Sequence, residues 1–173
     1  MKTIVVQMAD CKLSDEPDAM LVTYALGSCI AVSIYDRLAR VGALLHIMLP
    51  NSSMQPRRAE ANPFIFADTG LRALFGKAHA AGLKKHRALV CLAGGAQVMD
   101  QNGVFNIGTR NHTAVRNILR RSGLMVHASA VGGMQSRTVS LEIGTGAVWV
   151  REDGISERQL YPAGGNVANG RTT

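Results

Sequence analysis

The sequence contains few cysteines and few aromatic residues. Its three cysteines form no CxxC pair, and aromatic residues make up 5% of the chain, with a single tryptophan. An odd number of cysteines argues against a disulfide framework. The lack of an aromatic RNA-binding signature and of zinc-finger spacing argues against nucleic acid as a partner. No charged-then-apolar leader begins the sequence, so we expect a protein of the reducing cytoplasm that binds no nucleic acid.

Long apolar runs and metal-binding motifs are missing as well. The longest mainly apolar runs, such as residues 41–50, have about half the length that a membrane-spanning helix needs. The five histidines form no HxH or HExxH motif, and none lies at ligand spacing from a cysteine. We therefore expect no membrane insertion, no metal site and no other cofactor.

The chain has enough apolar content for one core. It has 173 residues, of which 47% are hydrophobic, and no internal repeat divides it. We expect one domain over residues 1–155 and a flexible tail over the polar, glycine-rich residues 156–173. No helical segment shows an apolar seam beyond its core face, so we expect a monomer.

The formal charge of +7 lies in the first 150 residues. Two predicted helices carry much of it: Arg72, Lys77, Lys84, Lys85 and Arg87 lie around the first, and Arg110, Arg116, Arg120 and Arg121 lie on the second. A basic face of this kind attracts acidic partners and speeds their encounter. The alternative is a solvated surface without a specific partner.

Hydrophobic periodicity predicts a mixed α/β domain. Apolar, β-rich runs predict about seven or eight strands, and two segments with helical spacing follow at residues 63–82 and 111–121. Between the fourth strand and the first helix, residues 51–62 are polar and without periodicity. We interpret that segment as an exposed loop and a candidate substrate lip.

Residues 23–50 bring together the side chains that carry chemistry. Cys29 follows the Gly27-Ser28 turn and precedes a buried strand over residues 30–35, and His46 lies in a second such run. The five residues between the runs suit a hairpin loop. Pairing the runs about Leu38 puts Ile30 opposite His46, which brings the thiol and the imidazole within one residue of each other across the ladder.

Such a pair suits nucleophilic catalysis. The thiolate is the reactive form of cysteine, and a neighbouring imidazolium lowers the pKa of the thiol. The turn at Gly27 and Ser28 can also leave backbone N–H groups unpaired near Cys29, where they would hold a developing oxyanion. The alternative remains open, because cysteine is among the most buried residue types and a histidine in an apolar strand is often a core residue.

An ordered set of short motifs extends over about 130 residues. It comprises Leu26-Gly27-Ser28-Cys29, Tyr35-Asp36, Gly42, His46-Ile47-Met48-Leu49-Pro50, Phe66-Ala67-Asp68, Gly94-Gly95-Ala96, Asn106-Ile107-Gly108, Arg110-Asn111, Gly132-Gly133, Arg137 and Thr145-Gly146. This set resembles the chemoreceptor glutamine deamidase family, CheD. Two departures bear on loop geometry and substrate fit: Ser136 stands where the family usually has glycine, and Cys91-Leu92-Ala93 where it has a lysine and an aromatic residue.

The resemblance implies a fold and an activity. The fold is two packed mixed or antiparallel β-sheets with a helix on each outer side, the four-layer α/β/β/α layout of bacterial toxin deamidases. The catalytic residues are Cys29, His46 and Thr23, and an oxygen of Thr23, from its hydroxyl or its backbone carbonyl, holds the imidazole. The activity is hydrolytic deamidation of glutamine to glutamate on the cytoplasmic helical bundle of bacterial chemotaxis receptors, without a cofactor.

Two other hypotheses stay open at this point. The protein could be a non-catalytic regulator that docks on receptors or on a CheC-like chemotaxis phosphatase, since family members bind such a phosphatase. It could also be another thiol hydrolase, such as an esterase or a transamidase, because the same site serves those reactions.

Overall fold

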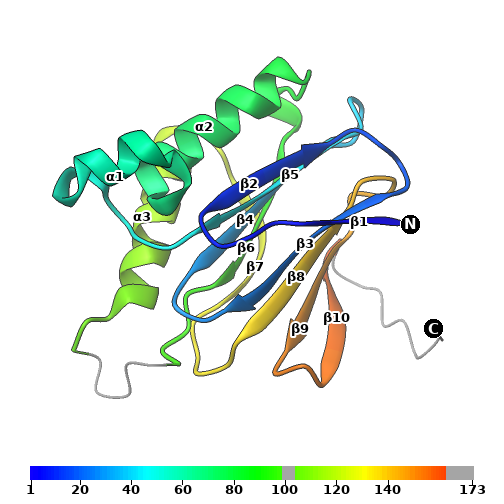
Figure 1. Cartoon of the computed structure of the whole chain (residues 1–173). Helices are drawn as coiled ribbons and strands as arrows, with labels where there is room; N and C mark the ends of the chain where they lie inside the picture. Colours follow the sequence, from blue (N-terminus) through cyan, green and yellow to red (C-terminus); the bar gives the residue numbers. More distant parts are fainter. Residues whose placement is uncertain (99–103, 163–173) are drawn as a thin grey trace.

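Two five-stranded sheets form the centre of the molecule (Figure 1). The computed structural model describes residues 1–98 and 104–162. The first sheet contains β1 (Lys2–Val5), β3 (Ala19–Leu26), β8 (Arg137–Glu142), β9 (Val148–Glu152) and β10 (Ser156–Tyr161), in that order. The second sheet contains β2 (Asp10–Ser14), β5 (Val41–Ile47), β4 (Ile30–Asp36), β6 (Leu89–Gly94) and β7 (Val126–Val131), in that order.

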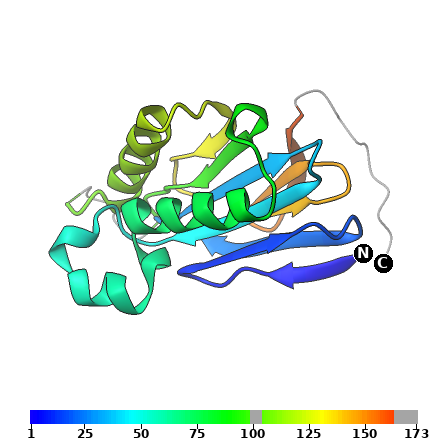
Figure 2. The same ribbon diagram turned by 90° about the horizontal axis from the view of Figure 1, so that it is seen from above.

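Three α-helices and three short 3₁₀ helices complete the described chain. The α-helices are α1 (Pro56–Ala61), α2 (Ala67–Ala80) and α3 (Ile107–Arg121), and the 3₁₀ helices are η1 (Ser52–Met54), η2 (Pro63–Ile65) and η3 (Lys85–Arg87). Helix α1 lies at the end of the molecule opposite to the N-terminus (Figure 2).

Two apolar cores hold these layers together. Leu71 and Leu74 of α2 and Val115 and Leu119 of α3 pack against one face of the second sheet. The other core lies between the sheets and contains residues such as Leu21, Leu44 and Leu141. Every residue of β4 and β5 is buried, because these strands have a covered face on both sides. This double burial explains their continuous apolar sequence.

The expected two packed mixed sheets with flanking helices are confirmed, but the layer order differs from the expected one. In the part of the chain that the structure describes, α2 and α3 both cover the second sheet, which gives an α/β/β order rather than a helix on each outer side (Figure 1). The outer strands β1 and β10 of the first sheet are mostly exposed and offer a helix no apolar face to bury.

Three predicted boundaries also differ. The tail expected from residue 156 begins instead with β10, which pairs with β9, and residues 163–173 lie outside the described residues. The segment 51–62, expected as a loop, contains α1. Helix α3 begins at Ile107 rather than near residue 111, because Asn106 takes a left-handed conformation (φ 50°) immediately before it. None of the described helices has the length and apolar character needed to cross a membrane.

Candidate active site

Cys29 lies in the short connection between β3 and β4, at the end of the sheet where β5 ends and the chain continues to α1. The end of β3 is irregular: its register with β8 shifts between Thr23 and Leu26, and Ala25 takes a left-handed conformation with φ 55°. A non-glycine residue in this region costs free energy and commonly marks a tight turn or a functional site. The connection therefore leaves the sheet sharply before it presents the thiol.

The hairpin of β4 and β5 sets the position of His46. Ala31, not Ile30, lies opposite His46, so the predicted register was wrong by one residue. The reason is the turn, in which Asp36 pairs with Val41 and leaves four residues between the strands instead of five. A shift of one residue moves a side chain to the other face of a sheet. In the observed register Cys29 and Ala31 both pack against the core between the sheets, the face that His46 shares with its pairing partner Ala31.

Thr23 holds the imidazole from the opposite sheet. Its hydroxyl lies 2.7 Å from His46 Nδ1 and donates a hydrogen bond to the backbone carbonyl of Val6 at 2.8 Å. A hydroxyl has a single proton to donate, so Thr23 Oγ1 accepts from Nδ1–H. The hydroxyl rather than the backbone carbonyl of Thr23 therefore orients the ring, and the bare nitrogen of the neutral imidazole is Nε2.

Burial makes both groups neutral. His46 is 2% exposed, and burial lowers the pKa of its imidazole to about 4, although the Asp10 carboxylate acts in the opposite direction. Burial also raises the pKa of the partly buried Cys29 thiol, which its own backbone N–H opposes. His46 Nε2 has no hydrogen-bond partner among the described residues, and so the thiol and the imidazole are not yet bonded.

Backbone N–H groups near the thiol remain available. In the described part of the chain, no backbone hydrogen bond is donated by Gly27, Ser28 or Cys29, whereas two of their carbonyls accept bonds from Gly95 and Ala96, both at 2.8 Å. The bonds to the Gly27 and Cys29 carbonyls fix the orientation of the peptides in this turn. The N–H groups of the turn, which have no backbone acceptor, can therefore donate to a substrate. Such an arrangement suits the stabilisation of an oxyanion.

Asn111 is a site residue that the sequence analysis did not select. This fully buried residue of α3 donates from Nδ2 to the carbonyls of Ser28 (2.9 Å) and Met48 (2.8 Å). One amide thus ties the thiol loop to the end of the strand that carries His46. A signal was present in the sequence, because Asn111 lies four residues from both Ile107 and Val115 on the inner face of the helix, where a polar residue needs a partner.

Two glycines allow the β6 end to approach the thiol loop closely. Gly94 (φ 107°) lies where a Cβ atom would collide with the Cys29 carbonyl oxygen, and Gly95 (φ 63°) where a Cβ atom would lie 2.8 Å from Ile30 Cδ1. Only glycine fits these two constraints together. The backbone of Gly94 and Gly95 therefore packs directly against Cys29 and Ile30.

The β7–β8 loop closes the same end of the molecule. Gly132 donates to the Gly94 carbonyl (2.9 Å), and Arg137, 7% exposed, donates to the Gly132 carbonyl (2.8 Å) and pairs with Glu152 (3.0 Å). Ser136 has no positive φ and uses its backbone carbonyl to accept from the N–H of Asp153. The loop therefore accommodates serine at position 136, where the family usually has glycine, without a left-handed backbone conformation.

The other two cysteines differ from Cys29. Cys11 and Cys91 are buried, and burial raises the pKa of their thiols to about 12 and about 11. Cys91 pairs with Ser33 in the middle of the second sheet, so the second departure from the family pattern concerns the core. The described residues contain no group of three or more His, Cys, Asp or Glu side chains arranged for a metal ion.

The fold and the site together define a class. A partly exposed thiol, a buried imidazole with one nitrogen anchored, and unpaired backbone N–H groups are the components of a thiol-dependent hydrolase. The chain belongs to the CheD family: the family model, described as CheD chemotactic sensory transduction, matches residues 48–152. That match begins just after His46, but full-length relatives cover the whole site.

Three relatives show the extent of the similarity. A probable chemoreceptor glutamine deamidase CheD of Solibacter usitatus is 46% identical over 96% of this chain and all of its own length. Proteins named in the same way from Syntrophus aciditrophicus and Anaeromyxobacter dehalogenans are 41% and 43% identical, over 92% and 87% of this chain and 100% and 95% of their own.

Proposed function

We propose that this protein hydrolyses the side-chain amide of specific glutamines on the cytoplasmic domain of chemotaxis receptors, with Cys29 as nucleophile. The names of its relatives support the reaction and the substrate. The observation that carries the mechanism is the hydrogen bond between Thr23 and His46 across the two sheets. It directs the basic nitrogen of His46 away from Thr23, in a core that Cys29 also borders.

The first half-reaction forms a thioester. Because the thiol and the imidazole are both neutral, the Cys29 proton moves to His46 Nε2 as sulfur attacks the carboxamide carbon. This transfer requires the Cys29 sulfur and His46 Nε2 to come within hydrogen-bond distance of each other. The N–H groups of Ser28 and Cys29 donate to the oxyanion, and the proton on Nε2 then passes to the leaving nitrogen, which departs as ammonia.

The second half-reaction consumes one water molecule. Nε2 accepts a proton from water as its oxygen attacks the thioester carbon, and the same proton returns to sulfur when the carbon–sulfur bond breaks. Thr23 accepts from Nδ1–H throughout and stabilises the transient imidazolium. The products are glutamate and ammonium, and no cofactor takes part.

The chemical change has a physical consequence for the substrate. Each turnover converts a neutral side chain into an anion on a bundle of helices. Added negative charge changes the repulsion between helices and shifts the balance between signalling states. The protein thus acts as a covalent regulator of receptor charge.

Peptide mass spectrometry tests this proposal. A receptor cytoplasmic fragment incubated with the wild-type protein gains about one dalton at particular glutamines, the difference between NH₂ and OH, and Cys29→Ala abolishes that gain because the nucleophile is lost. Cys11→Ala, which removes a buried thiol from the core between the second sheet and the helices, on the other face of the sheet from Cys29, serves as the matched control and retains turnover. Deamidation at an unchanged rate by Cys29→Ala would eliminate the thiol mechanism.

A second candidate function is a regulatory protein that docks on receptors or on a CheC-like phosphatase without catalysis. The neutral thiol and the unpaired His46 Nε2 favour it, since the pair is not activated in the resting structure. An iodoacetamide-reactivity profile of Cys29 against pH discriminates the two. Alkylation that speeds up when the receptor fragment is added supports catalysis, whereas unchanged, slow alkylation with stable co-purification supports docking alone.

A further inference from the structure

A continuous groove runs along the seam between α2 and α3. Three hollows of about 420, 300 and 360 Å³ follow one another along this seam. The first and second share Asp68, Ile118 and Arg121, and the second and third share Phe75 and Ser122. We call this chain of hollows the α2–α3 groove.

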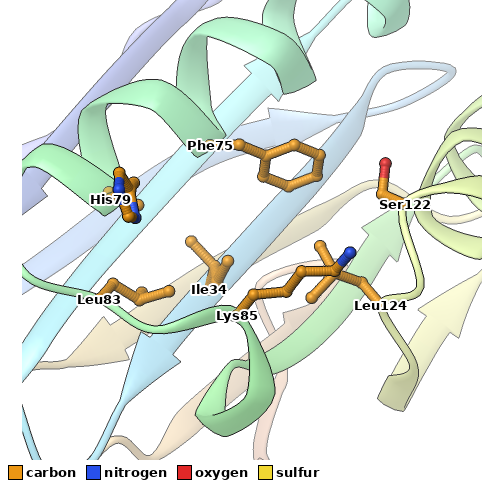
Figure 3. Close-up of a pocket in the computed structure, with 8 residues that line it drawn as sticks. Ile34, Phe75, His79, Leu83, Lys85, Ser122 and Leu124 are labelled. Carbon is orange, nitrogen blue, oxygen red and sulfur yellow. The ribbon is translucent and has the colours of Figure 1, made fainter.

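The floor of the groove is apolar. Ala114 and Ile118 line its first hollow, and Ile118 and Phe75 line its second. At the far end Phe75, Ile34 and Leu124 line the third hollow (Figure 3). An exposed apolar strip with a polar rim is typical of a surface that binds another protein. The length of α2, 14 residues at about 1.5 Å each, gives the groove a length of about 21 Å. That length suits about four turns of a helix.

The rim is positively charged and its charges are free. Arg72, Arg110 and Arg121 line the groove, and none of them forms an ion pair with another described residue. Helix α3 carries four arginines and no acidic residue. The carboxylate of Asp68, which also lines the groove, already accepts hydrogen bonds from Ser52, the shortest at 2.6 Å. The rim is therefore complementary to an acidic partner.

The groove begins at the candidate active site. Its first hollow is lined by Pro50 and Asn51, which follow the strand that carries His46, and by Thr109 and Arg110 of the first turn of α3. The next residue, Asn111, is bonded to the carbonyls of Ser28 and Met48. A helix seated in the groove thus has one end next to the loop that presents Cys29.

We propose that the α2–α3 groove binds an acidic amphipathic helix of the receptor bundle, packed beside the helix whose glutamine enters the site. This inference rests on the proposed function and adds a docking surface to it. The apolar face of the bound helix lies on Ile118 and Phe75, and its acidic residues face the arginines of the rim. Helix-in-groove binding of this type uses anchors at spacings of three, four and seven residues.

Charge reversal on matched sites tests the groove. We would measure the Kd of a fluorescently labelled receptor cytoplasmic fragment in the Cys29→Ala background, where binding proceeds without turnover. Arg72→Glu with Arg121→Glu reverses two rim charges, and Lys77→Glu with Arg116→Glu makes the same change in net charge on the same two helices outside the groove. We expect the rim pair to raise the Kd about tenfold or more and the control pair to raise it about twofold or less.

A steric variant separates docking from long-range attraction. Thr113 lines the first hollow and is exposed, and so Thr113→Trp fills the groove without changing its charge. We expect this variant, in the active protein, to raise KM for the receptor fragment while kcat at saturation stays unchanged. An unchanged KM in both Thr113→Trp and the rim pair, in a protein that does deamidate receptors, would overturn the inference.

The same experiment separates this inference from the proposed function. If the wild-type protein leaves receptor glutamines unmodified but the rim pair still loses binding, the proposed function fails and the groove stands as a docking site. Duplex DNA added as a competitor distinguishes the remaining partner class. DNA that binds more tightly than the receptor fragment, and loses binding in the same rim variants, would overturn the assignment of an acidic helix.

Discussion

The two ends of the sandwich treat their buried polar groups in opposite ways. At the end opposite to Cys29, the carboxylate of Asp36 is fully buried and accepts from the guanidinium of Arg87 (shortest 2.7 Å) and from the N–H groups of Lys84, Leu38 and Ala39. Three buried side-chain atoms have no hydrogen-bond partner in the described residues: His46 Nε2 and Asn111 Oδ1 lie at the Cys29 end, and Trp149 Nε1 lies on β9.

This difference suggests a division of roles, in which the Asp36 end stabilises the fold and the Cys29 end carries the reactive groups. An unsatisfied buried polar atom costs about 1–3 kcal/mol, whereas a satisfied network at the Asp36 end holds the β4–β5 turn to η3. Proteins tolerate such costs mainly where function needs an unpaired donor or acceptor. The Cys29 end therefore keeps the hydrogen-bonding capacity that a substrate would use, and the Asp36 end contributes rigidity.

The surfaces of the two ends differ in the same sense. Six exposed large apolar side chains lie at the Cys29 end, on loops, on η1 and on the irregular end of β3: Met8, Tyr24, Met54, Val98, Met134 and Ile155. Three of these six are methionines, whose flexible side chains adapt to partners of different shape. These apolar side chains at the Cys29 end suit contact with several glutamine sites on one receptor.

The largest expected effect is the loss of turnover in His46→Gln. Glutamine can still donate to Thr23 but cannot accept and return a proton, so we expect kcat to fall about a thousandfold. The melting temperature should change little, because the glutamine amide keeps a bond to Thr23 and, like His46, leaves buried hydrogen-bonding capacity without a partner. Parallel deamidation assays and thermal melts measure both quantities, and a strong loss of stability would show that His46 belongs to the framework instead.

Asp36→Asn should have the converse effect. Removal of the buried charge leaves the Arg87 guanidinium without its counter-ion, and we expect the free energy of unfolding to fall by about 3 kcal/mol. The value of kcat per folded molecule should stay unchanged. Urea denaturation monitored by circular dichroism gives the first quantity, and Asp18→Asn, an exposed carboxylate, is the control. A loss of kcat in Asp36→Asn without unfolding would contradict the separation of the two ends.

A smaller effect is expected for Asn111→Asp. The carboxylate cannot donate to the Ser28 and Met48 carbonyls and repels both, so the thiol loop loses its position. We expect kcat to fall about thirtyfold with a smaller change in KM, by analogy with the loss of about 2 kcal/mol of positioning and hydrogen bonding. Arg116→Gln, which makes the same change in net charge at an exposed position of the same helix outside the α2–α3 groove, is the control and should leave kcat unchanged.

The smallest effect is in the dependence on pH. The pKa of His46 is lowered in the fold, so His46 contributes stability above its ordinary value of 6.5 that is lost as the pH falls from 6.5 through about 4. Burial opposes ionisation of Asp36, but the bonds from Arg87 and the backbone hold its pKa well below the ordinary 3.8, so its contribution is lost only at lower pH.

These windows can be measured separately. The difference in unfolding free energy between wild type and His46→Gln should change between pH 6.5 and about 4, and that between wild type and Asp36→Asn only below 3.8. In the same way, the acidic limb of kcat/KM should lie near pH 4 and not near 6.5. An acidic limb near 6.5 would mean that the imidazole is solvated when it acts.

Some structural features of this protein could be predicted from the local sequence and others could not. The buried runs of β4 and β5, the turn before Cys29, and the glycines at 94 and 95 were all readable, because apolar periodicity and left-handed backbone leave residue-level signals. The register of the hairpin was not readable to one residue, since loops of four and five residues suit this sequence equally. That single residue decides which face the histidine takes.

The sequence by itself determined the identity of the candidate nucleophile, the mixed α/β class and the positive charge of the helices, because each depends on residue type and short-range pattern. Only the tertiary structure decided the rest. The Thr23 hydroxyl reaches His46 across two sheets, Asn111 joins two loops, and α2 and α3 share one sheet and form a groove. These contacts join residues far apart in the chain, and their geometry is set by how whole layers pack.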